Sequence, residues 1–112
     1  MTQLSLKSNS SIECLKLLGD FWTLRIIDVL SGGPRRFTDL HRLATGVTTV
    51  TLTRRLKVLE VNQLITRTEV SRADVRYALT TLGQKAIPMI EAVAYYSRSA
   101  ELMQAQATRL DQ

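Results

Sequence analysis

Cysteine, histidine and long apolar runs are scarce in this chain, and each shortage excludes a class of protein. Cys14 has no second cysteine to pair with, so an internal disulfide is excluded and a cytosolic protein is favoured. No apolar run approaches the roughly 18 residues that cross a membrane, and no signal-peptide pattern opens the chain. The sequence therefore predicts a cytoplasmic protein with no membrane partner.

Residue patterns that carry catalysis or bind metals are also missing. The chain has no glycine-rich phosphate loop, no paired carboxylates and no nucleophile beside a base, so we expect neither an enzyme nor a cofactor. His41, the only histidine, has no Cys, Asp or Glu at ligand spacing, so no metal site is expected. A plain surface histidine is favoured, and contact with a phosphate is the alternative.

Positive charge is concentrated in one part of the chain. The 112 residues include 15 Lys or Arg and 10 Asp or Glu, a net charge of +5. Residues 35–85 contain ten basic and four acidic side chains, a balance of +6, which leaves −1 for the rest. Clustered positive charge is typical of a surface that contacts nucleic-acid phosphates, although charge alone fits an ordinary solvated surface equally well.

The length and patterning predict one domain, residues 12–112, after a flexible tail of residues 1–11. Ser10 and Glu13 have the spacing of a capping box, which predicts a first helix that ends in a left-handed residue at Gly19. Asp20 is expected to cap a second helix. The inner face of that helix would carry Trp22, Ile26, Val29 and Leu30.

Residues 37–61 have the pattern of two helices joined by a short turn, which is the helix-turn-helix arrangement. Thr38 and Thr48 are the expected N-caps, with Gly46 in the turn. A leucine stripe in the second helix is expected to face the core: Leu52, Leu56 and Leu59. The opposite face would carry Val50, Arg54, Lys57 and Val61, flanked by Thr51 and Thr53. Arg and Thr side chains can read base edges in a major groove.

Two β-rich segments, residues 64–70 and 75–79, follow this helix, and Ser71–Asp74 joins them as a hairpin tip. Inward packing is expected for Ile65, Tyr77 and Leu79, and contact with the DNA backbone or minor groove for Arg67, Arg72 and Arg76. A helix followed by a positively charged β-ribbon is the layout of a winged helix-turn-helix. The predicted fold class is therefore α+β, mainly α.

A last helix is predicted from Thr80 or Thr81 to about Thr108, kinked or broken at Pro88. It carries more apolar side chains than one small core needs: Ile87, Ile90, Val93, Tyr96, Leu102 and Met103. Such a surface predicts burial against a second copy, hence a homodimer. Tyr95 and Tyr96 are assigned to the dimer seam, with a small effector pocket as the alternative.

Several strings of residues resemble, in order, the HxlR-type family of bacterial winged helix-turn-helix regulators, within the MarR-like superfamily. They are Cys14 followed by Leu18-Gly19, Phe21–Leu24, Gly33–Phe37 with Leu40, Gly46–Thr48, Leu52-Thr53 with Arg55-Leu56 and Leu59-Glu60, Tyr77 with Leu79-Thr80 and Leu82-Gly83, and Pro88. The resemblance covers residues 12–95. It implies a sequence-specific DNA-binding transcriptional regulator on a palindromic operator. It also implies that the N- and C-terminal helices form a dimer and that residues 48–61 read the operator.

Two positions depart from the family pattern. The family usually has Asp-Gly before the first wing strand, whereas this chain has Asn62-Gln63. Asn62 can adopt a left-handed conformation, so we expect the turn to survive, shifted by one residue if necessary. The hairpin tip Ser71–Asp74 is shorter than the family's and lacks its Pro, as in MarR-like or ArsR-like regulators.

The candidate DNA-binding residues lie in the helix-turn-helix and the wing: Arg35, Arg36, Thr38, Thr48, Val50, Thr51, Thr53, Arg54, Arg55, Lys57, Arg67, Arg72 and Arg76. Cys14 lies where the family often has a redox-sensing cysteine, so the resemblance implies an oxidant or electrophile effector. A cysteine packed in the dimer interface is the other interpretation. Two further functions stay open: a winged-helix module that binds protein, and a MarR-like or ArsR-like regulator that responds to a small ligand. Arg54, Arg55 and Lys57 favour DNA over protein.

Overall fold

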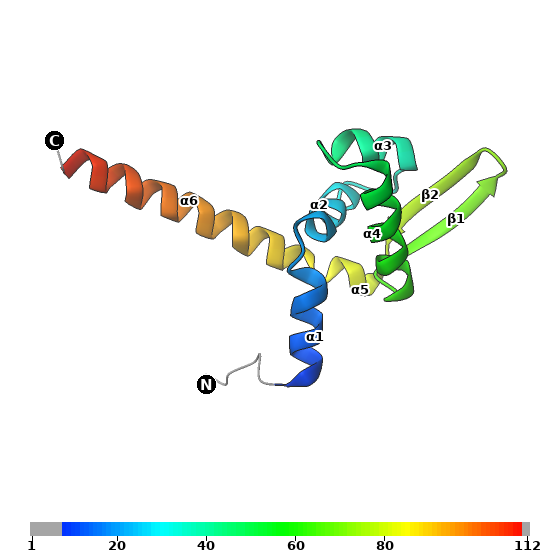
Figure 1. The fold of residues 1–112 in the computed structure, drawn as a ribbon, viewed down its shortest axis with the longest axis horizontal. Helices are drawn as coiled ribbons and strands as arrows, with labels where there is room; N and C mark the ends of the chain where they lie inside the picture. Colours follow the sequence, from blue (N-terminus) through cyan, green and yellow to red (C-terminus); the bar gives the residue numbers. More distant parts are fainter. Residues whose placement is uncertain (1–7, 111–112) are drawn as a thin grey trace.

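The computed structural model describes residues 8–110 and confirms the winged helix-turn-helix, mainly α-helical with one small sheet. Figure 1 shows a helical body from which a β-ribbon projects on one side and a long helix on the other. In chain order the elements are α1 (Asn9–Leu18), α2 (Phe21–Leu30), α3 (Phe37–Leu43), α4 (Thr49–Val61), β1 (Ile65–Ser71), β2 (Asp74–Leu79), α5 (Thr81–Gln84) and α6 (Ile87–Leu110).

Two predicted helix starts are confirmed by capping hydrogen bonds. The Asp20 carboxylate accepts a hydrogen bond from the backbone N–H of Thr23 at 3.0 Å. The Thr48 hydroxyl accepts one from the backbone N–H of Thr51 at 3.1 Å. Each bond satisfies an N–H group that has no partner within its helix. α2 and α4 therefore begin at the caps that the sequence indicates.

The start and end of α1 differ from the prediction. Ser8 is the N-cap in place of Ser10, because the Ser8 hydroxyl accepts the Ser11 backbone N–H at 3.1 Å. Residues 9–11 are therefore helical and do not belong to the predicted tail, whereas residues 1–7 lie outside the described part of the chain. Gly19 follows the helix as predicted, but it is not left-handed, because its φ is −79°. Its N–H still bonds to the Leu15 carbonyl, as it would inside a helix.

The start of α3 also differs. The predicted cap, Thr38, lies inside the first turn, and Arg36 occupies the N-cap position without a side-chain capping bond. The physical reason is the neighbouring backbone: Arg35 forms an antiparallel bridge with Tyr77, so the chain is extended up to Arg36 and turns helical at Phe37.

The core lies between α2, α3, α4 and the base of the ribbon. The leucine stripe of α4 is buried, with Leu52 and Leu59 fully covered and Leu56 3% exposed. On the opposite face Val50 is 63% exposed, as predicted. The other buried apolar side chains are Ile26, Ile27, Leu30, Leu40, Ala44, Val47, Leu64, Ile65 and Ala86, against which Trp22, Val29, Phe37, Tyr77 and Leu79 pack. α4 therefore has a buried face, which packs against the body through its leucines, and an opposite face that is exposed to solvent.

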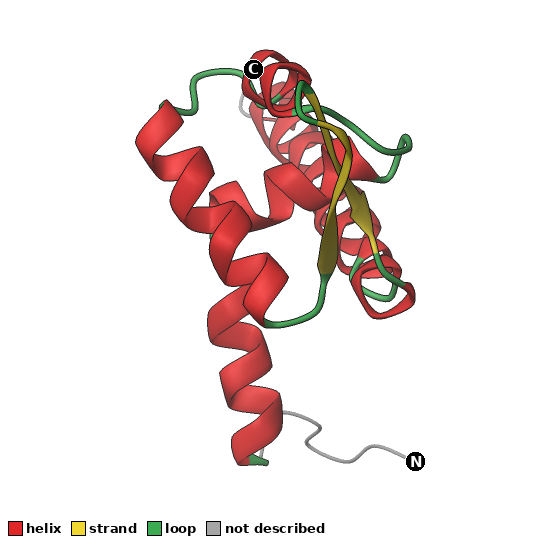
Figure 2. Cartoon of the chain, turned by 90° about the vertical axis from the view of Figure 1, so that its right-hand side faces the viewer, coloured by secondary structure: helices red, strands yellow, loops and turns green. Residues whose placement is uncertain are grey.

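The wing is a two-stranded antiparallel ribbon (Figure 2). Its pairs run from Ile65 opposite Leu79 to Ser71 opposite Asp74, with an irregularity between Glu69 and Ser71. The predicted hairpin tip is therefore confirmed, and only Arg72 and Ala73 lie outside the strands. Because side chains alternate between the two faces of a strand, Asp74 and Arg76 share one face of the ribbon.

The turn between α4 and the wing survives the Asn62-Gln63 departure with a shift of one residue. Asn62 has φ −86°, and Gln63 takes the left-handed conformation at φ +63°. The Leu64 N–H bonds to the Leu59 carbonyl at 2.9 Å, and the Gln63 N–H bonds to the Glu60 carbonyl at 3.0 Å. These two bonds form a Schellman motif, in which glycine is the usual left-handed residue.

The C-terminal region is broken into two helices, as Pro88 indicated. α5 ends at Gln84, and α6 begins at Ile87 with Pro88 in its first turn, where a missing N–H costs nothing. α6 then extends away from the body, and none of its residues is buried. The radius of gyration of 17.3 Å exceeds the roughly 13 Å expected for a compact chain of this length. None of the helices within residues 8–110 combines the length and apolar character needed to cross a bilayer.

Candidate nucleic-acid interface

The outer face of α4 is the central part of the candidate interface. A shallow depression on this face is lined by Thr49, Val50, Thr53, Arg54, Lys57 and Val58. Arg54 is exposed and has no ion pair among the described residues, so its guanidinium is available to an external acceptor. Lys57 is 74% exposed and only loosely paired with Glu60, at 3.9 Å. The face thus combines cations and small apolar groups, which suit base edges and thymine methyl groups.

Thr49 and Val58 lie on this face but were missing from the sequence-based set. Their signal was present in the spacing, since residues 49, 50, 53, 54, 57 and 58 recur at helical intervals on one side. Thr51, which was in the set, is half-buried at the edge of the face, while Thr53 is exposed. Thr48 is exposed at the N-terminus of α4, where its hydroxyl is already the capping acceptor.

Arg55 is directed to the protein rather than to the outer face. Its Nε donates to Asp20 Oδ2 at 2.8 Å, and its Nη2 donates to Asp20 Oδ1 at 3.1 Å. This two-point contact lowers the pKa of Asp20 and raises that of Arg55, mainly through the hydrogen bonds between them. The assignment of Arg55 to DNA stays a prediction, and the fold adds a partner that the sequence did not indicate, because it brings Asp20 to the arginine from 35 positions away.

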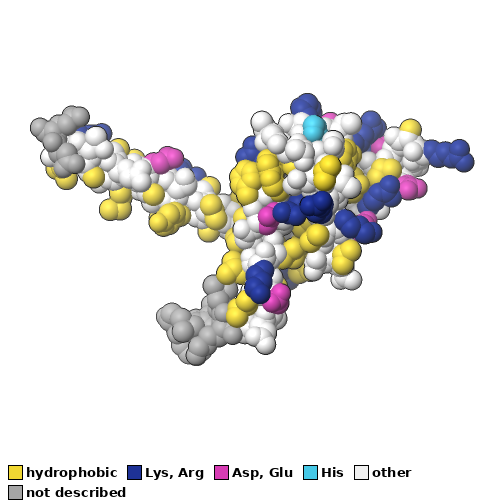
Figure 3. Space-filling view, in the orientation of Figure 1, with side chains coloured by type: hydrophobic (Ala, Val, Ile, Leu, Met, Phe, Trp, Pro, Cys, Tyr) yellow, Lys and Arg dark blue, Asp and Glu magenta, His cyan; other side chains and the backbone are white. Residues whose placement is uncertain are grey.

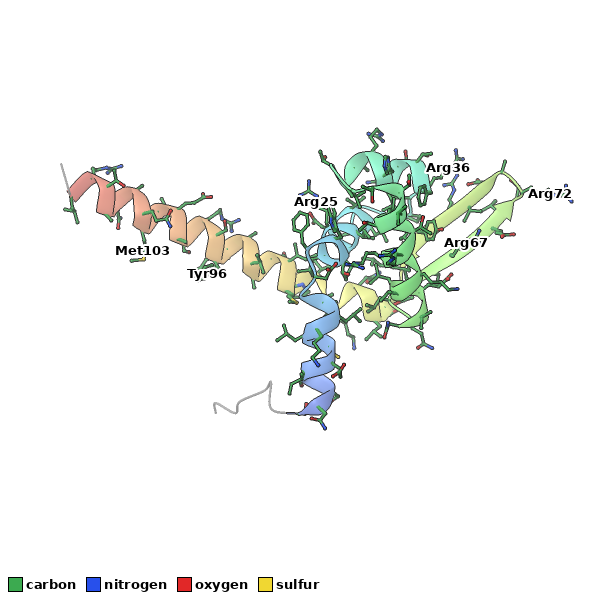
Figure 4. All side chains as sticks on the ribbon, in the orientation of Figure 1. Arg25, Arg36, Arg67, Arg72, Tyr96 and Met103 are labelled. Atoms are coloured by element: carbon green, nitrogen blue, oxygen red, sulfur yellow. The ribbon has the colours of Figure 1, made fainter. Side chains whose placement is uncertain are left out.

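The wing carries three of the predicted arginines, at different distances from the helical body. Arg72 lies at the hairpin tip, the part of the wing farthest from the body (Figure 4). Arg67 lies on the face of β1 that also lines a groove with Lys57 and Tyr77. Its Nη1 donates to Glu69 Oε1 at 3.0 Å, and this bond, together with the Tyr77 side chain, raises the pKa of Arg67.

Arg36 and Arg76 share a single carboxylate. The Nε atoms of Arg36 and Arg76 lie 3.2 and 3.1 Å from Asp74 Oδ1, and Nη2 of Arg76 lies 3.3 Å from Oδ2. The hydrogen bonds from Arg76 and the nearby charge of Arg36 lower the pKa of Asp74. Both guanidinium groups are about half exposed, whereas the Asp74 side chain is 19% exposed. Asp74 was not among the predicted residues, because it lies 38 positions from Arg36 and no local pattern links the two.

Arg35 and Thr38 lie beside this cluster in different environments. Arg35 is half-buried, and its backbone exchanges hydrogen bonds of 2.9 and 2.8 Å with Tyr77. Its Nε is buried without a hydrogen-bond partner among the described residues, so this side chain packs against the body as well as carrying charge. Thr38 is exposed at the N-terminal end of α3.

The two ends of the molecule differ in surface chemistry, as Figure 3 shows. Basic side chains gather over α3, α4 and the wing, and hydrophobic side chains follow one edge of α6. Several of the basic side chains are paired with carboxylates, among them Arg36, Arg55 and Arg76, so fewer of them are unpaired than the number of basic residues suggests. Within residues 8–110, no three His, Cys, Asp or Glu side chains lie close enough together to hold a metal ion.

Cys14 lies on α1, outside the helix-turn-helix and the wing. Its side chain is exposed. It lines a groove between α1, the end of α4 and α5, whose other walls are Leu17, Leu18, Asn62, Leu64, Leu82, Lys85 and Ala86. The thiol is therefore accessible within a mostly apolar groove.

Comparison with known proteins gives the same fold and family. Residues 17–105 match the model of the HxlR-like helix-turn-helix family. The transcriptional regulator YodB of Bacillus subtilis is 36% identical over 73 residues, which are 63% of this chain and 65% of YodB. The chain thus spans just under two thirds of this relative. The uncharacterized regulator YtfH of Escherichia coli is 34% identical over 86 residues, 75% of this chain and 68% of YtfH.

Solved structures of YodB agree with the sequence match. The reduced form superimposes with a TM-score of 0.73 at 27% identity, over 80% of this chain and 90% of YodB. The quinone-bound form gives 0.72 at 27% identity, over 82% and 99% of the two chains. With a family match over most of its length and the same fold in solved relatives, this chain belongs to the HxlR-like helix-turn-helix family.

Proposed function

We propose that the chain binds double-stranded DNA with the outer face of α4 in the major groove and the wing on the backbone. The observation that supports this assignment most is the different environment of two neighbouring arginines on α4. Arg54 is free on the exposed face of α4, whereas Arg55, the next residue, is tied to Asp20. Arg54 also lies in the N-terminal half of the helix, where recognition helices contact base edges. We therefore assign base reading to Arg54 and phosphate contact to Arg72 and Arg76.

Substitution of Arg54 tests this division. Arg54→Ala should weaken binding to the operator by roughly 1–3 kcal/mol and reduce the preference for operator over random DNA. Arg72→Ala should weaken binding to all sequences alike and lower the salt slope by about 1. Arg109→Ala, near the far end of α6, is the matched control and should change neither quantity.

Fluorescence anisotropy over a range of salt concentrations measures both quantities, with DNA from upstream of the chain's own gene as the first probe. An unchanged ratio of operator to random affinity in Arg54→Ala would show that another side chain reads the bases.

We further propose that two copies associate through α6 and α1. α6 exposes Val93 at 56%, Tyr96 at 74% and Met103 at 70%, and α1 has no buried residue. Tyr96 and Met103 lie on the same side of α6 (Figure 4). A groove between α2 and α6, lined by Phe21, Leu24, Ile90 and Val93 among others, adjoins that side.

The solvent-accessible area of the chain is large enough to include a surface that a second copy covers. The chain exposes 8372 Å², about 2,000 Å² more than a compact monomer of this mass. A standard protein interface buries roughly 800 Å² on each partner, so the excess on one chain is more than enough for one. A dimer of this kind places two copies of α4 on half-sites of a palindromic operator, about 34 Å apart.

Light scattering on an α6 variant tests the dimer. The wild type should have twice the mass of 12.6 kDa. Met103→Glu should shift it towards a monomer, because a charge would be buried in the apolar seam. Ala105→Glu, which lies on the opposite side of the same helix, is the control and should leave the mass unchanged. A wild type that is monomeric at micromolar concentration would refute the proposal.

We propose that the effector is an oxidant or an electrophile that reacts with the Cys14 thiol. We also propose that the protein acts in the cytoplasm. Two observations support it: the relative YodB has been solved in a quinone-bound form, and the exposed Cys14 thiol lies in an apolar groove that suits a flat ring. Because the chain has one cysteine, a disulfide formed on oxidation must pair Cys14 with the same residue of a second copy or with a small thiol.

A further inference from the structure

One carboxylate lies between two arginines at the base of the wing, although every acidic group there weakens the attraction of DNA. The Arg36–Asp74–Arg76 cluster contains three side chains and a net charge of +1. Both arginine Nε atoms donate to the same oxygen, Asp74 Oδ1, at 3.2 and 3.1 Å. Asp74 is the most buried of the three, since its side chain is 19% exposed, compared with 54% for Arg36 and 46% for Arg76.

The backbone around the cluster is fixed by the antiparallel bridge between Arg35 and Tyr77. Its two hydrogen bonds, of 2.9 and 2.8 Å, join the segment before α3 to strand β2. Arg36 follows Arg35 and Arg76 precedes Tyr77, so each arginine is one residue from this bridge. Asp74 and Arg76 project from the same face of β2, two residues apart. The cluster therefore connects the wing to the N-terminal end of α3 through side chains as well as backbone.

Each guanidinium keeps donors that the carboxylate does not use. An arginine has five N–H groups; Arg36 donates from Nε, and Arg76 donates from Nε and Nη2. The remaining donors belong to groups that are about half exposed, while the carboxylate lies behind them. Charged N–H donors in a fixed planar fork match the oxygens of a phosphodiester.

From this geometry we propose that Asp74 is a positioning residue of the DNA interface, which aligns Arg36 and Arg76 on one stretch of the DNA backbone. Without Asp74, two flexible like-charged side chains would repel each other and would have to be ordered when DNA binds. Ordering a long side chain on binding lowers affinity, and Asp74 removes this cost in advance. This inference rests on the DNA interface proposed above.

A purely electrostatic role for Asp74 predicts that its removal strengthens DNA binding, whereas a positioning role predicts that its removal weakens binding. The direction of the change in affinity therefore tests the inference. If Asp74 only screened the arginines, Asp74→Asn would remove one negative charge from a DNA-facing surface. Binding would then be tighter and the salt dependence steeper. If Asp74 positions the arginines, the same substitution weakens binding, because the amide cannot accept two charged donors as strongly as a carboxylate does.

Glu69 provides a matched control on the same ribbon. Its carboxylate pairs with Arg67 at 3.0 Å, but it is 63% exposed and contacts one arginine only. Glu69 and Asp74 lie on opposite faces of the wing, because Glu69 pairs with Val75 across the ribbon. Glu69→Gln therefore removes the same charge without disturbing the Arg36–Asp74–Arg76 cluster.

The experiment measures affinity by fluorescence anisotropy at several salt concentrations. One labelled duplex comes from upstream of the chain's own gene and the other has the same bases in scrambled order. Asp74→Asn should bind both about three- to tenfold more weakly, with a salt slope lower by about 1. Glu69→Gln should bind both as tightly as the wild type or up to about threefold more tightly. Circular dichroism and thermal melting verify that each variant is folded.

Arg36→Ala, made alone and with Asp74→Asn, measures the coupling. Its effect on affinity should be clearly smaller in the Asp74→Asn background, because the arginine is no longer aligned there. Binding by Asp74→Asn as tight as or tighter than that of the wild type would overturn this inference alone. A wild type that binds neither duplex would overturn the proposed interface, and the inference with it.

Discussion

Substitution of Asp20 separates two roles that its carboxylate has at the same time. It caps α2 by accepting the Thr23 backbone N–H at 3.0 Å and hydroxyl at 3.1 Å, and it holds Arg55 of α4 through two hydrogen bonds. Asp20→Asn keeps a good capping residue but removes the charge, whereas Asp20→Ala removes both. We expect these variants, with Arg55→Ala, to rank by the number of interactions lost.

The magnitudes follow from exposure and hydrogen bonding. Loss of an N-cap costs about 1 kcal/mol. Hydrogen bonds to charged groups contribute roughly 1.5–3 kcal/mol, but both side chains here are about 30% exposed, so about 1 kcal/mol is a fair value for the pair. Thr23 is 1% exposed, and an unsatisfied buried hydroxyl costs about 1 kcal/mol more. Asp20→Ala should therefore cost about 3 kcal/mol, and Asp20→Asn and Arg55→Ala about 1 kcal/mol each.

Thermal unfolding at a fixed protein concentration measures these differences, since about 1 kcal/mol corresponds to roughly 4 °C for a chain of this size. The pH dependence provides a second readout. Folding lowers the pKa of Asp20 below its usual value of 3.8, so its contribution is present above that pH and is lost as the pH falls through the folded-state pKa. The difference between the wild type and Asp20→Asn should be constant near neutral pH and shrink in acid.

Two results would refute this reasoning. If Asp20→Asn melted at the wild-type temperature at neutral pH, the ion pair would contribute nothing to stability. If Arg55→Ala melted normally but lost its affinity for DNA, Arg55 would be a DNA contact, and its bond to Asp20 would break when DNA binds.

Three other substitutions address single features of the fold and the effector. Gln63→Gly should stabilise the protein by about 1 kcal/mol, because Gln63 has φ +63°, a conformation that costs a side chain roughly that much; an unchanged midpoint in urea would refute this. Gly83→Ala should destabilise it by about 1–3 kcal/mol in the same assay, because an added Cβ would overlap the Leu64 carbonyl; wild-type stability would show that α5 can move away. After treatment with diamide or a quinone, the wild type should change its operator affinity while Cys14→Ser does not. Equal responses of the two proteins would exclude Cys14 as the sensor.

The sequence by itself determined the features of this protein that depend on nearby residues. The leucine stripe of α4 follows helical periodicity, and Asp20 and Thr48 bond to N–H groups three residues away. The hairpin tip, predicted at Ser71–Asp74 from the β-rich segments on either side, is confirmed around residues 72 and 73. The left-handed turn before the wing was also expected, although backbone bonding moved it from Asn62 to Gln63.

Only the tertiary structure decided which arginines are paired with a carboxylate and which are left without one. Arg54 and Arg55 are neighbours of the same type in the sequence, yet folding brings Asp20 to one and leaves the other exposed. Asp74 reaches Arg36 in the same way, across 38 positions. Ion pairs between distant residues leave no periodic pattern in a sequence, because they depend on how α2, α3, α4 and the wing pack together. The chain's composition therefore indicated how much charge is present, and the packing of its elements decided where that charge remains available.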